Sequence, residues 1–286
     1  MIIIKNHPTM TYSSSHASPW QWKSTSQGEF LTCELLKDWC HGFFSVDFAG
    51  QPPKVLSQYL DDSAKAFRLK QIHTNIIFST SAVEVRKDEK GNVIYSQGDG
   101  IITEKPLESV WVASADCTPV LMADRTLGKV CAIHSGWRGT ASEIVPDAIA
   151  LFDQLGSKKE DLLFALGPAI HGEVYQVDIP VALQVLSTIF EGTDQEILTQ
   201  GYNSLNKVIL EDNEEGKVRL NVTQVINTQI QQKGIEKEQI AIAPYCTYQN
   251  PERFFPTVAP TKKISNGLEL LLNSKSFKFY HPTPTS

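Results

Sequence analysis

The 286-residue sequence has no long hydrophobic run, no excess of basic residues and no pair of closely spaced cysteines. The first apolar run, Met1 to Ile4, is far too short for a membrane span or a signal peptide, which predicts a cytoplasmic protein. A net charge of −6 with scattered lysines and arginines argues against a nucleic-acid-binding surface. Five cysteines without a CxxC pair are typical of a reducing compartment. We therefore expect neither a membrane nor a nucleic acid as partner, and any metal site has to be assembled by the fold.

The chain has a mixture of helical and strand patterns. Its length allows one large α/β domain or two small ones, and no internal repeat or long linker divides it. We predict a loose arm rich in Ser, Thr, His and Pro over residues 1–27. One α/β domain with antiparallel hairpins then follows over residues 28–280, before a frayed Pro-rich end at 282–286.

Periodicity and turn residues indicate the individual elements. The predicted helices cover 54–67, 144–155, 178–189 and 221–234. The predicted hairpins pair residues within 83–95, 120–122 with 130–133, and 208–210 with 218–220. The remaining predicted strands cover 69–78 (around His73), 101–103, 110–113 and 239–245.

Three residues that suit a metal, His73, Cys117 and His134, each stand at the end of a short apolar run. A strand that ends at a polar residue delivers that side chain to the rim of a sheet, where clefts form. Two imidazoles and one thiolate suit zinc and leave a fourth position open for water or substrate, which is typical of a catalytic site. The alternative, that each is an ordinary surface or core residue, stays open on spacing alone.

The segment from His134 to Gly139, His-Ser-Gly-Trp-Arg-Gly, places two glycines around a Trp-Arg pair between a strand and a helix. Free amides at such a turn favour an anion, with Thr140 as a possible N-cap, and Arg138 can grip phosphate or carboxylate with its planar guanidinium. The alternative is a tight turn whose arginine faces solvent. Cys117 could also be a nucleophile with His73 or His134 as its base, and spacing does not separate this from a metal site.

Taken together, several segments resemble the YfiH family, also called multicopper polyphenol oxidases, laccase-domain proteins or peptidoglycan editing factors. The resemblance is strong from about residue 68 to 177 and weaker around Cys246-Thr247. The segments that carry it, in the family's order, are Gln71-Ile72-His73, Gly98-Asp99-Gly100, Ala115-Asp116-Cys117-Thr118-Pro119-Val120, His134-Ser135-Gly136-Trp137-Arg138-Gly139 and Leu166-Gly167-Pro168-Ala169-Ile170.

The resemblance implies a single α/β domain, a layered sandwich of mixed β-sheets flanked by helices, with zinc held by His73, Cys117 and His134. It implies phosphorolysis of adenosine, inosine, guanosine or methylthioadenosine, and deamination of adenosine, with a purine nucleoside and phosphate as partners. Arg138 and the neighbouring amides would then hold phosphate. The older laccase label implies copper, which is less expected because seven histidines without an HxH pair are few for a multicopper oxidase.

Three alternatives to the phosphorylase remain open: a copper-dependent polyphenol oxidase, a metal-free Cys–His hydrolase in peptidoglycan editing, and a non-catalytic metal-binding family member. The last is allowed by departures from the family pattern. Residues 254–263 lack the arginines usual after the Cys-Thr pair, and Asn221-Val222 stands where Asp-Leu is common. These departures put the substrate range in doubt but not the metal ligands.

Overall fold

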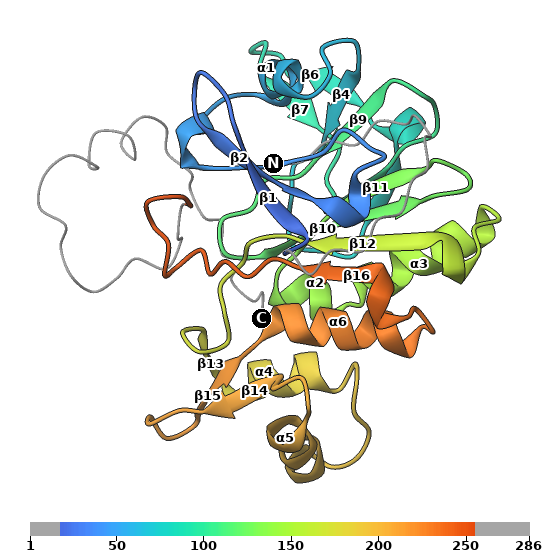
Figure 1. Cartoon of the computed structure of the whole chain (residues 1–286). Coiled ribbons are helices and arrows are strands. Elements are labelled where there is room, and N and C mark those ends of the chain that lie inside the picture. Colours follow the sequence, from blue (N-terminus) through green and yellow to red (C-terminus); the bar gives the residue numbers. More distant parts are fainter. Residues whose placement is uncertain (1–17, 255–286) are drawn as a thin grey trace, which may run out of the picture.

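The computed structural model describes residues 18–254, and its centre is a six-stranded mixed sheet (Figure 1). The strand order is β16-β12-β10-β11-β8-β5. The pairs in the middle are antiparallel, while β5 and β16 join the two edges in parallel. The strands are β5 Ile77–Ser79, β8 Gly100–Ile102, β10 Thr118–Asp124, β11 Val130–Ser135, β12 Leu162–Leu166 and β16 Ile240–Ile242.

The β10–β11 hairpin forms the middle of this sheet and confirms the hairpin predicted there. Every residue of both strands is buried, as expected of strands covered on both faces. The Asp124 carboxylate closes the turn by accepting hydrogen bonds from the amides of Thr126 (2.7 Å) and Leu127 (2.6 Å). Gly128 completes it in the left-handed conformation, at φ 67°.

Alternate residues of β10 face two different hydrophobic cores. Val120 and Met122 pack in the core that contains α3 and α6, whereas Leu121 and Ala123 pack against the sheet β1-β2-β3 on the opposite face. Figure 1 shows the resulting layers, with the small sheet above the large one and α6 below it, followed by α4, α5 and a second small sheet. The structure confirms the predicted α/β class and the layered arrangement of mixed sheets and helices.

The helices predicted over 144–155, 178–189 and 221–234 are confirmed near those bounds, whereas α2 and α5 were not predicted. Pro146 lies in the first turn of α3, where the missing amide has no intrahelical partner to lose. Gly156 and Gly234 follow α3 and α6 with φ of 90° and 85°, and the Asn221 side chain caps α6 by accepting from the Gln224 amide at 3.2 Å. The helices are α1 Pro53–Leu56, α2 Trp137–Ala141, α3 Ile144–Gln154, α4 Ile179–Leu186, α5 Asp194–Asn203 and α6 Val222–Gln232.

Within the described residues, four smaller sheets accompany the central one and include the other two predicted hairpins. Their orders are β1-β2-β3, β13-β15-β14, β4-β9 and β6-β7. Their strands are β1 Trp20–Ser24, β2 Glu29–Cys33, β3 Phe43–Phe44, β4 Lys65–Arg68, β6 Val85–Lys87, β7 Val93–Tyr95, β9 Glu108–Trp111, β13 Gln176–Asp178, β14 Ile209–Glu211 and β15 Lys217–Leu220. Short 3-10 turns lie at Glu34–Leu36, Val46–Phe48, Ser57–Tyr59, Thr80–Ala82, Lys159–Asp161 and Lys237–Gln239.

Part of the segment predicted as a loose arm is ordered in a strand. Residues 20–24 form β1, which pairs with β2, and Trp20 is buried with its ring centroid 5.5 Å from that of Phe43. Burial of a large aromatic side chain explains why this polar stretch joins the domain. The division into an arm and one domain stays a prediction, and residues 1–17 and 282–286 lie outside the described residues.

Two predictions between residues 54 and 78 are wrong. The helix expected over 54–67 is a single α turn and a 3-10 turn, because Lys65–Arg68 pairs in parallel with Glu108–Trp111. Pairing with a distant segment overrides the local helical pattern. The strand expected over 69–78 is mostly a loop, and only its last residues join β5. Within the described part of the chain, no helix is long and apolar enough to cross a membrane.

The core between the large sheet and α3 depends on Phe152, which is fully buried. Replacing Phe152 with alanine is expected to lower the free energy of unfolding by about 3–5 kcal/mol, because the change leaves a cavity. Urea denaturation measures the loss. Leu155, the C-cap of α3 three residues further along the chain, is 42% exposed, so Leu155→Ala is the matched control and should cost less than about 1 kcal/mol. Equal losses would contradict the assignment of α3's inner face.

Candidate metal centre

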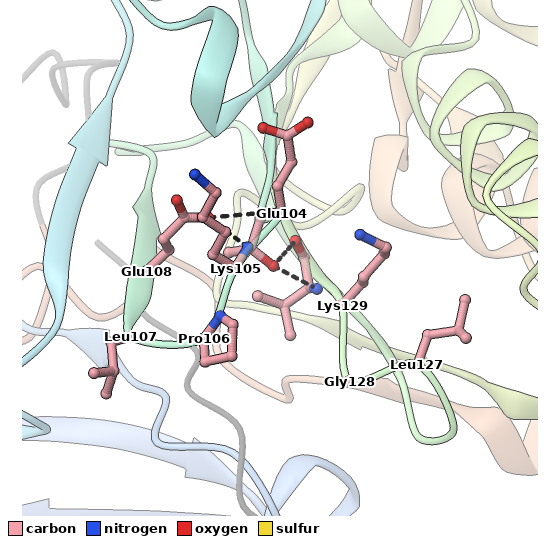
Figure 2. Close-up of a pocket in the computed structure, with 10 residues that line it drawn as sticks. Glu104, Lys105, Pro106, Leu107, Glu108, Leu127, Gly128 and Lys129 are labelled. Carbon is pink, nitrogen blue, oxygen red and sulfur yellow. Dashed lines mark hydrogen bonds between the residues drawn. The ribbon is translucent and has the colours of Figure 1, made fainter.

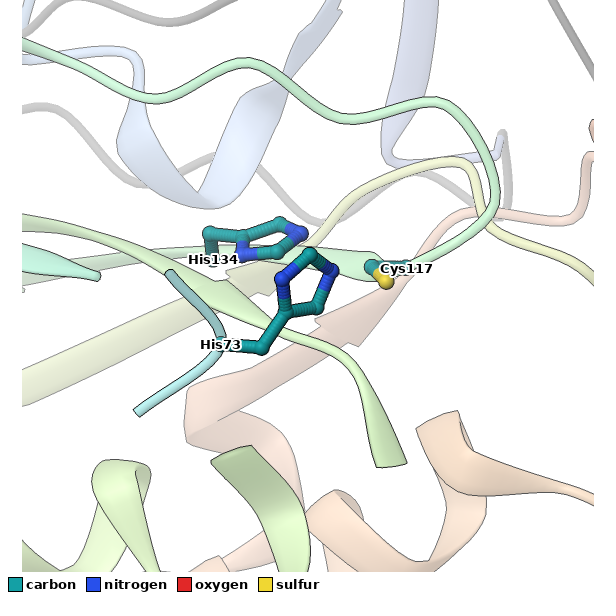
Figure 3. A group of neighbouring side chains, drawn as sticks. All are labelled: His73, Cys117 and His134. Carbon is teal, nitrogen blue, oxygen red and sulfur yellow. The ribbon is translucent and has the colours of Figure 1, made fainter. Parts of the chain in front are cut away.

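The fold brings His73, Cys117 and His134 together, as predicted (Figure 3). One potential ligand atom from each residue lies within 4.8 Å of those of the other two. The two imidazole rings are nearly perpendicular, with centroids 4.9 Å apart and an angle of 79° between their planes. His134 is buried, Cys117 is half-buried and His73 is exposed, so the cluster reaches the surface on the His73 side.

The register of the β10–β11 hairpin places two of the three residues side by side. Thr118 pairs with Ser135 and Pro119 with His134, so Cys117 lies just beyond the end of β11. The expected delivery of each side chain from the end of a strand is wrong in detail. Cys117 precedes its strand, and His134 lies within β11 rather than after it. The antiparallel pairing, rather than strand ends, creates the cluster.

His73 comes from a loop that is hydrogen-bonded to the segment before Cys117. Its backbone is left-handed, with φ 61°, which is uncommon for a residue other than glycine. The Gln71 side chain makes two hydrogen bonds of 2.7 Å to the backbone N–H and carbonyl of Ala113, in the segment that leads to Cys117. A loop fastened in this way can hold an exposed histidine in one place.

Asp99 lies beneath the cluster and was not singled out among the predicted site residues. Its side chain has no exposure, and its Oδ1 lies 2.9 Å from His134 Nδ1. Its Oδ2 accepts from the amides of Ile72 (3.2 Å) and Thr74 (2.8 Å) and from the Thr74 hydroxyl (3.0 Å). The signal in the sequence was an acid between two glycines at the start of an apolar strand.

Cys117, His134 and Asp99 alter one another's pKa values. Burial alone would raise the pKa of Cys117, but hydrogen bonds from His134 and His73 and their charges lower it to about 7. Burial opposes the charged form of His134, yet hydrogen bonds to Asp99 and Cys117 raise its pKa to about 9. The pKa of Asp99 falls to about 2, because its hydrogen bonds to His134, Thr74 and Ile72 outweigh its burial. The cluster thus favours a thiolate, which is the form of cysteine that binds metals.

Gly136 allows the close approach of Cys117. A Cβ built on Gly136 would lie 2.5 Å from Cys117 Sγ and 3.6 Å from His73 Cδ2. The backbone at Gly136 is extended, with φ −79°, so its conformation does not require glycine. Space for the sulfur atom is what the position requires.

Arg138 is exposed and lies in α2, directly after strand β11, which carries His134. Its guanidinium carbon lies 4.3 Å above the Trp137 ring, and it makes no ion pair within residues 18–254. The prediction that Thr140 caps the helix is wrong, because Gly136 is the N-cap of the five-residue helix α2. Thr140 lies within α2 and donates its hydroxyl hydrogen to the Gly136 carbonyl at 2.9 Å. The anion-binding role of this turn stays a prediction.

Other polar residues lie around Cys117 on segments far apart in sequence. Burial raises the pKa of Tyr175 to about 12, the negative charges of Cys117 and Asp116 raise it further, and the positive charge of Arg138 opposes them. Its phenol therefore stays protonated and can donate a hydrogen bond. Asp116 accepts from the Thr247 hydroxyl at 2.8 Å. Nothing in sequence spacing linked Tyr175 to Cys117.

The remaining cysteines and His171 take no part in the cluster. Cys131 and Cys246 are buried, as predicted for core residues. The His171 amide donates to Cys246 Sγ at 3.3 Å. A small cavity of about 90 Å³ lies at the other end of β8 and β11, between Glu104–Glu108 and the turn before Val130 (Figure 2). The three cluster residues do not line it.

Metal affinity at this cluster is expected to fall about a thousandfold between pH 8 and pH 6. A metal must displace the His134 proton below pH 9, which costs about tenfold in affinity per pH unit, and the Cys117 proton as well below pH 7. Zinc competition titrations with a chelator of known pH dependence measure the change. A pH-independent affinity would contradict the assignment of these ligands.

Comparisons with known proteins agree with the motifs. The sequence profile of the family described as multi-copper polyphenol oxidoreductase laccase matches residues 54–263. A purine nucleoside phosphorylase of Synechocystis sp. is 43% identical over 241 residues, which cover 82% of this chain and 90% of the relative. A purine nucleoside phosphorylase of Bacteroides thetaiotaomicron is 28% identical over 158 residues, covering 55% of this chain and 54% of the relative.

Two solved structures share the fold. YfiH of Bacillus licheniformis aligns over 71% of this chain and 72% of its own, with a TM-score of 0.57 and 24% identity. YlmD of Geobacillus stearothermophilus aligns over the same shares, with a TM-score of 0.59 and 22% identity. The family profile covers most of this chain, and the alignment with the Synechocystis relative covers nearly all of that protein. The chain therefore belongs to the laccase-like YfiH family, described as multi-copper polyphenol oxidoreductase laccase.

Proposed function

We propose that this protein is a zinc-dependent purine nucleoside phosphorylase that acts on adenosine, inosine, guanosine and methylthioadenosine, with adenosine deaminase as a second activity. The observation that carries the proposal is the convergence of two imidazoles and one thiol within 4.8 Å at the surface. The names of the Synechocystis and Bacteroides relatives support the substrate class. The cytoplasmic location stays a prediction.

His73, Cys117 and His134 would hold the zinc ion, and the donor set fits it. Zinc bound by three protein ligands supplies Lewis-acid chemistry and makes water more acidic. Copper accepts the same donors, but a multicopper oxidase needs several metal sites. Within residues 18–254, this cluster is the one group of three or more His, Cys, Asp or Glu residues with donor atoms this close. That supports a single metal and not a laccase.

Arg138 would hold phosphate, the nucleophile of the reaction. In phosphorolysis a phosphate oxygen bonds to ribose C1′ as the bond from C1′ to the purine nitrogen breaks, and the purine takes the electron pair. Because the Arg138 guanidinium packs on the face of Trp137, its N–H groups remain available at its edge for an anion. The Tyr175 phenol, whose raised pKa keeps it neutral and which interacts electrostatically with Cys117 and Arg138, would be a hydrogen-bond donor to the substrate.

A metal-free Cys–His hydrolase is the second candidate, and the lowered pKa of Cys117 favours it. A thiol with a pKa of about 7, paired with a histidine, is about half thiolate at neutral pH and thus a competent nucleophile. This candidate predicts that Cys117 is alkylated rapidly in the isolated protein and that activity survives chelation. It would act on an amide such as a peptidoglycan precursor.

The test is the metal content of the purified protein, followed on the same sample by adenosine turnover with and without phosphate. One zinc per chain and phosphate-dependent release of adenine would support phosphorolysis. Formation of inosine without any phosphate-dependent release of adenine would show a deaminase and not a phosphorylase. Zinc without any turnover would favour a non-catalytic metal-binding protein. Bound copper together with oxidation of phenols would favour a laccase. Amide hydrolysis that resists chelators, in a protein without metal, would favour the thiol enzyme.

A further inference from the structure

We infer that Asp99 is the positioning residue that makes this cluster able to bind a metal, because it orients both histidines with its two carboxylate oxygens. One oxygen holds the His134 ring, and the other holds the backbone on both sides of His73. The inference rests on the metal centre proposed above. It adds a specific role for a residue that contacts neither metal nor substrate.

Asp99 is fully buried, and its main chain is hydrogen-bonded both to the segment after His73 and to strand β11, which carries His134. Its amide donates to the Ile76 carbonyl at 2.9 Å, and its own carbonyl accepts from the His134 amide at 2.8 Å. A buried carboxylate is costly unless its lone pairs are satisfied. Here four donors satisfy it: the His134 ring, the amides of Ile72 and Thr74, and the Thr74 hydroxyl.

The contact with His134 determines which ring nitrogen is free. An ionised carboxylate only accepts hydrogen bonds, so His134 Nδ1 must carry the hydrogen that it donates to Asp99 Oδ1 at 2.9 Å. Once a metal displaces the second ring proton, the lone pair that binds it is therefore that of Nε2. Asp99 thus selects the metal-binding tautomer of His134.

The contact with the loop determines where His73 lies. The amides of Ile72 and Thr74, on either side of His73, both donate to Asp99 Oδ2. The two amides flank a left-handed residue, His73, whose φ is 61°. The carboxylate therefore stabilises a backbone conformation that a histidine would otherwise seldom adopt.

Asp99→Asn separates this role from simple filling of the core, because asparagine has the same shape but only one acceptor oxygen. If that oxygen faces the loop amides, the NH₂ group faces His134 Nδ1, which must become an acceptor and place its hydrogen on the metal-binding Nε2. If the oxygen faces His134, the NH₂ group meets the three donors of the loop. Either orientation disrupts one of the two ligands.

The experiment measures Co²⁺ and Zn²⁺ affinity, the visible Co²⁺ spectrum and thermal unfolding of the metal-free protein. We expect Asp99→Asn to remain folded. It should bind Co²⁺ about 10- to 100-fold more weakly than the wild type and show an altered Co²⁺ spectrum. The matched control is Asp124→Asn. Asp124 is an equally buried aspartate that closes the β10–β11 turn at the other end of the hairpin, so its variant should keep wild-type affinity and spectrum.

Wild-type affinity and spectrum in Asp99→Asn, or equal losses of affinity in both variants, would overturn the role of Asp99. A wild-type protein that binds neither ion would instead overturn the metal centre itself. If Asp99→Asn does not fold, ¹⁵N NMR of the zinc-loaded wild type decides. Hydrogen on His134 Nδ1 with metal on Nε2 supports the inference, and the opposite arrangement contradicts it.

Discussion

Replacing Cys117 with alanine is expected to abolish zinc binding and to lower kcat/KM for phosphorolysis by at least about a thousandfold. The thiolate is the one anionic donor among the three ligands, and two imidazoles alone do not hold a catalytic zinc. Zinc content per chain and the initial rate of adenine release, both on the same preparation, measure the effect.

Cys131→Ala is the matched control for this substitution. Cys131 is a fully buried cysteine of β11 in the hydrophobic core, and its pKa is raised by burial instead of lowered. Its variant should keep one zinc per chain and nearly full activity, with some loss of stability. A Cys117→Ala protein that retains zinc or turnover would show that the thiol is not a ligand.

Replacing Gly136 with alanine is expected to weaken zinc binding at least about a hundredfold, although the new side chain is a single methyl group. That methyl would lie 2.5 Å from Cys117 Sγ, so the sulfur has to move away from the two imidazoles. Ligand distances in metal sites tolerate only about 0.2 Å, so the displacement is large for such a site. A zinc titration of the folded variant measures it.

Gly139→Ala separates this effect from a general intolerance of the turn. A Cβ on Gly139 would meet nothing closer than 3.4 Å, which is ordinary van der Waals contact, and the residue lies three positions further along the same segment. Its variant should bind zinc as the wild type does. If both alanine variants bind zinc normally, the sulfur atom has more room than the structure gives it.

The closeness of Cys117 and His134 could be predicted from the sequence because the β10–β11 hairpin is a local structure. Its two strands and the glycine of its turn are readable from residue types, and antiparallel pairing then sets Cys117 beside His134. The layered arrangement of sheets and helices was implied by the resemblance to the YfiH family, while the helical spacing of apolar residues predicted α3 and α6. The hairpin and both helices depend on residues close together in sequence.

The loop that carries His73 could not be predicted in the same way. Its conformation depends on Asp99 and Ala113, which lie 25 to 42 residues away from their partners in the loop. A β-like composition around His73 predicted a strand, but hydrogen bonds to distant segments determine a left-handed turn. The helix expected over 54–67 failed for the same reason, since β4 pairs with the distant β9.

A cysteine that is about half ionised at neutral pH and only partly buried is open to attack by peroxide. Oxidation to a sulfenic acid would remove the thiolate that the proposed zinc site needs, so the metal-free protein would not take up zinc until a reductant restores the thiol. Zinc bound as proposed would protect the sulfur by occupying its lone pair. On the proposed function, the order in which metal and oxidant reach Cys117 would decide whether a newly folded chain becomes active.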